Sequence, residues 1–222
     1  MIKPFPEPGD QTMRKLQRRE FTTLGLVSGL ALSIGVPMAW AQDNPMPPEL
    51  RDAIERQPFS PVLGNPKGDV TLTEFFDYNC PHCRSSVPVI RKLIGDDPHL
   101  RVVLREWPVF GEGSEFCARA SLASLKQGKY WQFHSGLMAI RGRAEEASAM
   151  RIAQEVGMDL AKLKLDVGSA DVEGHIAQSM ALGDHMGLMG TPTFIAGNDA
   201  LFGKKSGSEL QQLVAQARKD LA

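Results

Sequence analysis

The sequence has little that would tie it to nucleic acid or to a nucleotide cofactor. Its formal net charge is −1, with 25 Lys and Arg against 26 Asp and Glu. No run of like charges marks an interaction tail, and no cofactor-binding motif is present. A mildly acidic surface offers no electrostatic reason to bind nucleic acid. We therefore expect neither a nucleic-acid partner nor a bound cofactor.

The sequence also lacks an apolar run long enough to span a bilayer. The stretch from Leu24 to Val36 is apolar but short, and Ala39-Trp40-Ala41 after it offers small residues at the two positions that a signal peptidase reads. Basic residues lie shortly before the stretch, at Arg14, Lys15, Arg18 and Arg19. We interpret residues 1–41 as a signal peptide that is cleaved near Ala41-Gln42, and Met13 as a candidate for the true start.

Two export routes are compatible with this signal. The pair Arg18-Arg19, with Phe21 two positions on, resembles a twin-arginine signal. The alternative is a general secretory signal in which two arginines happen to be adjacent. Either route places the mature chain outside the cytoplasm, and we expect a periplasmic protein.

Cysteine is scarce, with only three in 222 residues. Exported proteins form disulfides, and an odd number leaves one thiol unpaired within the chain. Two of the three, Cys80 and Cys83, are separated by only two residues. The third, Cys117, lies in a predicted helix.

The residue pattern predicts a lead-in at 42–59 with a short helix at Glu49–Arg56, followed by a domain at 60–222. Strands are expected at Ser60–Leu63, Val70–Phe76 and Leu100–Trp107, with a helix after Cys83. A helical block follows, with helices at Ser114–Lys126, Tyr130–Arg141, Glu145–Val156, Leu160–Val167 and Val172–Met186. The chain then predicts a hairpin of Thr193–Ala196 and Ala200–Phe202 and a last helix at Ser206–Leu221.

The order of these elements indicates an α/β fold with a mixed central sheet. A strand–helix–strand unit favours a parallel crossover, and the late hairpin adds antiparallel strands to the same sheet. The helical block at about 114–186 is therefore an inserted subdomain between the two halves of the sheet.

The pair Cys80 and Cys83 follows a strand and opens a helix, which is the context of a redox motif. Cys80 would lie where free backbone N–H groups and the helix dipole stabilise a thiolate, so it would be the nucleophile. Cys83, one turn further, would resolve the mixed disulfide. The His82 imidazole would lower the Cys80 pKa further. A structural disulfide or a metal site are the alternatives, but so short a bridge stabilises little and no further ligand pair is evident.

Two segments carry a resemblance to a known family. The first is Phe75-Phe76-Asp77-Tyr78-Asn79-Cys80-Pro81-His82-Cys83, and the second is Gly190-Thr191-Pro192-Thr193-Phe194. They resemble the active-site segment and the cis-proline loop of DsbA-like thiol–disulfide oxidoreductases of the thioredoxin superfamily, especially the short Com1-like and ScsC-like branch. The likeness runs roughly from Phe59 to the C-terminus and implies a thioredoxin-like fold.

The resemblance implies roles for three further residues. Pro192 would follow a cis peptide bond beside the disulfide, and the backbone of Thr191 would pair with a client segment as an added strand. The alternative is an ordinary trans proline that starts a strand. Glu74 would lie beneath the active site with a raised pKa and shuttle the Cys83 proton, unless it points into solvent. We interpret Asp77 as a loop acid.

We expect the Cys80–Cys83 disulfide to exchange with thiols of unfolded or reduced exported proteins and to be recycled by a membrane redox partner. An oxidase is the first hypothesis. An isomerase or reductase is the second, since Thr before the proline also occurs in isomerase-type relatives. A non-catalytic copper-handling module is the third. Cys117 departs from the family pattern, where a small residue such as alanine is expected, and is either an inert buried residue or a regulatory or intermolecular thiol.

Overall fold

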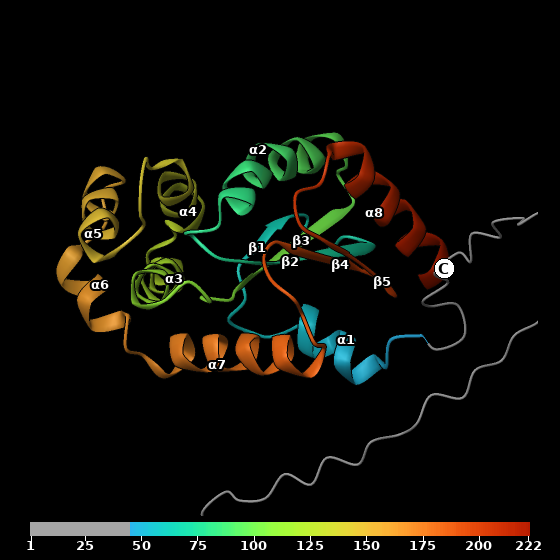
Figure 1. Ribbon diagram of the computed structural model, residues 1–222, viewed down its shortest axis with the longest axis horizontal. Coiled ribbons are helices and arrows are strands. Elements are labelled where there is room, and N and C mark those ends of the chain that lie inside the picture. The colour runs from blue at the N-terminus through green and yellow to red at the C-terminus, as the bar shows by residue number, and fades with distance from the viewer. Residues whose placement is uncertain (1–44) are drawn as a thin grey trace, which may run out of the picture. The chain divides into compact units, whose positions relative to one another are not determined.

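The computed structural model describes residues 45–222 (Figure 1). The predicted signal peptide at 1–41 lies outside the described residues. In chain order the elements are α1 (Pro48–Glu55), β1 (Val62–Gly64), β2 (Val70–Phe76), α2 (Pro81–Asp96), β3 (Leu100–Glu106), α3 (Glu112–Ser124), the short 3-10 helix η1 (Leu125–Gln127), α4 (Tyr130–Ala139), α5 (Glu146–Glu155), α6 (Leu160–Asp166), α7 (Ala170–His185), β4 (Thr193–Ala196), β5 (Asp199–Phe202) and α8 (Gly207–Leu221).

The strands form one mixed sheet in the order β1-β3-β2-β4-β5. β2 and β3 are parallel, and the other neighbouring pairs are antiparallel. Helices α2 and α8 cover one face of the sheet and α1 and α7 the other, while α3 to α6 gather beside the sheet (Figure 1). The predicted thioredoxin-like α/β fold with an inserted helical subdomain is confirmed.

The central strand β2 has both faces covered, and all seven of its residues are buried. Successive side chains on a strand point to opposite faces. Leu72 and Phe76 lie in the larger core, whereas Phe75 lies in a second core on the other face with Trp107 and Ile195. Full burial of such a side chain stabilises the fold by roughly 1.5–3 kcal/mol. With both faces covered, no side chain of β2 reaches solvent.

Several element boundaries differ from the sequence-based prediction by one or two residues. The third strand ends at Glu106, before Trp107, and α3 begins at Glu112, two residues early. The lead-in is partly integrated into the fold, because Ile54 of α1 packs in the core cluster that contains Phe75. Within residues 45–222, no helix has the length and apolar character needed to cross a membrane.

Candidate active site

The paired cysteines lie where β2 ends and α2 begins. Residues 77–79 form the turn between these elements, and Cys80 is the residue just before the helix, with φ −81° and ψ 117°. Pro81 occupies the first helical position, where its missing N–H costs nothing and its fixed φ suits a helix. Cys83 follows one turn later on the buried side of α2.

Hydrogen-bonding groups surround the Cys80 sulfur. Its Sγ accepts the backbone N–H of Cys83 at 3.4 Å and donates to the carbonyl oxygen of Thr191 at 3.3 Å. The residue is only 2% exposed. The first N–H groups of a helix have no partner inside the helix, and they carry partial positive charge. An anion at this position is therefore stabilised by the fold itself.

The two thiols differ strongly in pKa. The pKa of Cys80 is lowered to about 5, mainly because the Cys83 thiol donates to it, and further by the Thr191 side chain and the N–H groups of Cys83 and His82, against an opposing effect of burial. Burial raises the pKa of Cys83. The hydrogen bond between its thiol and Cys80, and the charge of Glu74, raise that pKa further. Cys80 is thus the thiolate of the pair and Cys83 its protonated partner.

Thr191 and Pro192 lie beside the sulfur of Cys80, just before β4. The peptide bond between them is cis, as the resemblance implied. Thr191 is 7% exposed, and among the described residues its buried hydroxyl has no partner that meets hydrogen-bond geometry. The carbonyl oxygen of Thr191 accepts from Cys80, which brings two segments that are 111 residues apart into contact.

Glu74 points into the protein, toward α2. Its side chain is on the same face of β2 as Leu72 and Phe76, and the residue is 2% exposed. The hydroxyl Oγ of Ser86 lies 2.6 Å from Glu74 Oε1 and 2.7 Å from the carbonyl oxygen of Cys83. Burial raises the Glu74 pKa to about 8, with a smaller contribution from the charge of Cys80. Glu74 is therefore largely protonated at neutral pH.

His82 is exposed on the first turn of α2. The group of His82 that lowers the Cys80 pKa is its backbone N–H. The role predicted for its imidazole stays a prediction.

Sequence reasoning gave Asp77 no specific role, yet Asp77 is 1% exposed and organises the turn before Cys80. Its Oδ1 accepts the N–H of Asn79 at 2.6 Å. This contact is an Asx turn, in which an aspartate side chain bonds to the backbone two residues further on. That local signal was available in the sequence. The other partners of the Asp77 carboxylate lie more than thirty residues further along the chain, so the sequence alone does not indicate them.

Cys117 lies in the middle of α3 and is completely buried. Burial raises its pKa to about 12, and the charge of Asp77 adds to this. Nearby, the hydroxyl of Tyr78 lies 2.5 Å from Ser121 Oγ and 3.0 Å from His134 Nδ1, so the turn before Cys80 also bonds to the helical insertion. Cys117 is a buried thiol in this interface.

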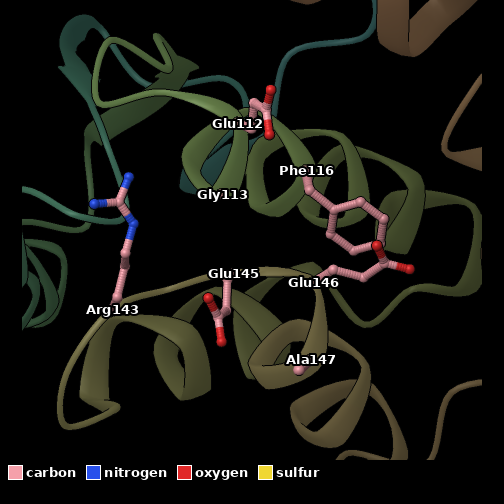
Figure 2. A pocket seen from close by; sticks show the side chains of 7 residues that line it. All are labelled: Glu112, Gly113, Phe116, Arg143, Glu145, Glu146 and Ala147. Carbon is pink, nitrogen blue, oxygen red and sulfur yellow. The ribbon is translucent and has the colours of Figure 1, made fainter.

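A surface pocket of about 640 Å³ lies between the start of α3 and the start of α5 (Figure 2). Glu112 approaches it from α3, and Arg143, Glu145 and Glu146 approach it from the segment that leads into α5. Its lining contains neither cysteine of the pair. Over residues 45–222, no group of three or more His, Cys, Asp or Glu side chains is arranged to hold a metal ion.

A thioredoxin-like fold with a Cys-x-x-Cys pair at a helix start is the architecture of thiol–disulfide oxidoreductases. A family model described as "DSBA-like thioredoxin domain" matches residues 71–215. The chain belongs to this DsbA-like family of thiol–disulfide oxidoreductases, and the resemblance seen in the sequence is confirmed.

Three proteins illustrate the similarity. A crystal structure of a thioredoxin-like oxidoreductase from Silicibacter pomeroyi is 50% identical, covers 76% of this chain and 98% of its own, and has a TM-score of 0.74. "Disulfide bond formation protein D" of Bacillus subtilis is 25% identical over 76% of this chain and 82% of its own. "Na(+)/H(+) antiporter NhaA 3" of Salinispora tropica is 30% identical over 60% of this chain. That match spans only 21% of the antiporter's length.

Proposed function

We propose that the protein is an extracytoplasmic oxidase that introduces disulfides into exported proteins through the Cys80–Cys83 couple. The observation that carries this proposal is the low pKa of Cys80, about 5. A stabilised thiolate makes the dithiol form more favourable, so the disulfide gives up its oxidising equivalents readily. The similarity to a protein named for disulfide bond formation supports the same direction.

The reaction is two successive thiol–disulfide exchanges. A client thiolate attacks the Cys80 sulfur of the disulfide, the Cys80–Cys83 bond breaks, and Cys83 leaves as a thiolate. A second client thiolate then attacks the client's sulfur in the mixed disulfide and releases the Cys80 thiolate. The client loses two electrons and the Cys80–Cys83 pair gains them. Cys80 is the better leaving group of the two because its pKa is the lower.

Glu74 supplies a proton in this scheme. Cys83 leaves as a thiolate in a buried site where its pKa is raised, so it must be protonated promptly. With its pKa raised to about 8, Glu74 holds a proton at neutral pH, and once ionised its charge raises the pKa of Cys83. In the reverse direction Glu74 would take the proton from Cys83. The Ser86 hydroxyl, 2.6 Å away, keeps the carboxyl oriented.

Thr191 and Pro192 provide the client contact. We propose that a client segment pairs with the backbone beside the cis bond as an added strand, which places its thiol at the Cys80 sulfur. The clients are unfolded or reduced exported proteins, and a membrane redox partner restores the disulfide. The predicted signal peptide at 1–41 supports this location.

The redox potential tests the proposal. The reduced protein is equilibrated with glutathione buffers, and the dithiol fraction is measured by alkylation and mass spectrometry. An oxidase requires a potential nearer to about −120 mV than to about −270 mV. A value at the lower end supports a reductase instead. An isomerase would rearrange a scrambled client at a faster rate than it oxidises a reduced one.

Copper titration separates the remaining alternative. A copper-handling module would bind Cu(I) tightly through Cys80 and Cys83 and would fail to oxidise a reduced client peptide. The oxidase proposal requires stoichiometric client oxidation by the metal-free disulfide form.

A further inference from the structure

Asp77 is a buried carboxylate that holds the turn before the reactive pair from several sides. Its Oδ2 accepts the backbone N–H groups of Val109 at 2.8 Å and Phe110 at 3.1 Å. Its Oδ1 accepts the N–H of Asn79 at 2.6 Å and the hydroxyl of Ser114 at 2.7 Å. Both oxygens are therefore used, and the carboxylate joins the turn to the segment that leads from β3 into α3.

The main chain of Asp77 bonds to Cys80 and influences the acidity of Cys83. Its carbonyl oxygen accepts the N–H of Cys80 at 3.2 Å. Its backbone also lowers the pKa of the Cys83 thiol, against the larger opposing effect of burial. Any movement of Asp77 therefore moves the backbone that carries Cys80.

Asn79 adds a second connection that depends on the first. Its Nδ2 donates to Ser114 Oγ at 2.9 Å and to the carbonyl oxygen of Ala144 at 2.9 Å, and the Ala144 N–H donates back to its Oδ1 at 2.7 Å. Ser114 thus bonds both to Asp77 and to Asn79. The turn before Cys80 is clamped against the helical insertion through this shared hydroxyl.

We propose that Asp77 is a positioning residue for thiol–disulfide exchange, whose carboxylate fixes the turn that carries Cys80 against the start of α3. This inference rests on the proposed redox function of that cysteine. Asp77 acts through the turn and has no part in the bond changes. The helical insertion thereby becomes a structural support for the reactive sulfur.

Removal of the Asp77 carboxylate has two opposite effects on the Cys80 pKa. The direction in which this pKa changes therefore shows which effect is larger. Loss of a nearby negative charge alone would stabilise the Cys80 thiolate and lower its pKa. Loss of the clamp would let the turn move, weaken the hydrogen bonds that the sulfur accepts, and raise its pKa. The positioning role predicts that the second effect is the larger.

The test is Asp77→Asn, with the Cys80 pKa read from thiolate absorbance against pH on the reduced protein. We expect a rise of about one unit, and an equilibrium constant with glutathione about tenfold less oxidising, since one unit corresponds to tenfold. Glu106→Gln is the matched control, because Glu106 is equally buried and bonds to Tyr130 at 2.7 Å instead. An unchanged or lowered pKa in Asp77→Asn overturns the proposal, and so does an equal rise in the control.

Ser114→Ala keeps the carboxylate charge and removes one of its four donors. We expect a smaller rise in the Cys80 pKa, and this variant decides the matter if Asp77→Asn does not fold. A folded Ser114→Ala protein with the wild-type pKa overturns the proposal. The pKa is measured without a client, so a wild-type protein with a thioredoxin-like potential would refute the oxidase while the effect of Asp77 remained measurable.

Discussion

Two buried cysteines of this chain have opposite acidities. Cys80 is 2% exposed and Cys117 is 0% exposed, so both thiols are removed from solvent. The pKa of Cys80 is nevertheless lowered to about 5, whereas that of Cys117 is raised to about 12. Burial alone would raise both, because it disfavours the charged thiolate.

The difference comes from the position of each cysteine relative to its helix. Cys80 precedes α2, and the free N–H groups of the first turn point at its sulfur. Cys117 lies in the middle of α3, where the backbone N–H groups are already bonded within the helix. Burial dominates there, and the charge of Asp77 opposes ionisation further. The donors around the Cys80 sulfur, the Cys83 thiol first and then the N–H groups at the helix start, rather than exposure, make Cys80 the reactive thiol.

Substitution of the cysteines tests the comparison of Cys80 with Cys117, and we expect it to have the largest effect on exchange activity. We expect Cys80→Ser to lose all exchange activity, because it removes the sulfur that exchanges with client thiols. Cys83→Ser should instead accumulate mixed disulfides with clients, since Cys83 can no longer attack the Cys80 sulfur and release the client. Cys117→Ala should retain wild-type exchange. Oxidation of a reduced client protein and non-reducing electrophoresis measure these outcomes. Mixed disulfides trapped by Cys80→Ser would reverse the roles of the pair.

The low pKa of Cys80 also predicts how stability depends on pH. In the folded dithiol protein this pKa falls from an ordinary 9.0 to about 5. Between these values the unfolded chain binds more protons, so the thiolate's contribution to stability is fully present above pH 9 and is lost as pH falls toward 5. Four units correspond to as much as about 5 kcal/mol. In the disulfide form Cys80 has no proton to lose.

Urea denaturation of both redox forms across this range of pH measures the effect. The dithiol form should gain stability relative to the disulfide form as pH rises. Subtraction of the two forms reduces the influence of Glu74, whose raised pKa makes stability fall as pH rises from 4.5 to about 8. Cys117→Ala is the control, since a thiol protonated in both folded and unfolded chains adds nothing over this window. A difference that stays constant with pH would refute the thiolate account.

Much of this fold could be predicted from the sequence because the signals are local. The β-branched and aromatic run at Val70–Phe76 and the Gly197-Asn198 turn of the hairpin depend on neighbouring residues only, and both elements are present. The sequence does not determine whether the Glu74 side chain points inward or into solvent, because a strand pattern alone does not say which face of the strand is covered. In the structure helices cover both faces of β2, so the Glu74 side chain is buried whichever face it is on.

The support of the active site could not be predicted in the same way. Three of the four donors to Asp77 lie 32 to 37 positions further along the chain, and only the tertiary fold brings them together. For His82 the sequence drew attention to the imidazole, the chemically distinctive group. The structure draws attention to its backbone N–H, which every residue except proline has.

Two substitutions of His82 separate these contributions and have the smallest expected effect. His82→Ser removes the imidazole and keeps the backbone N–H, whereas His82→Pro removes both. Because this N–H lowers the Cys80 pKa less than the Cys83 and Thr191 groups do, we expect His82→Ser to raise the Cys80 pKa by a few tenths of a unit and His82→Pro by about one unit at most. Each unit lowers the redox potential by about 30 mV, provided that Cys80 is ionised at the pH of measurement in both proteins. Thiolate absorbance against pH gives the Cys80 pKa, and glutathione equilibrium gives the redox potential.

Equal rises of the Cys80 pKa in the two variants would assign the effect to the His82 imidazole and restore the role that the sequence suggested. A potential that falls while the pKa stays fixed would mean that His82 acts on the disulfide form, through packing at the helix start.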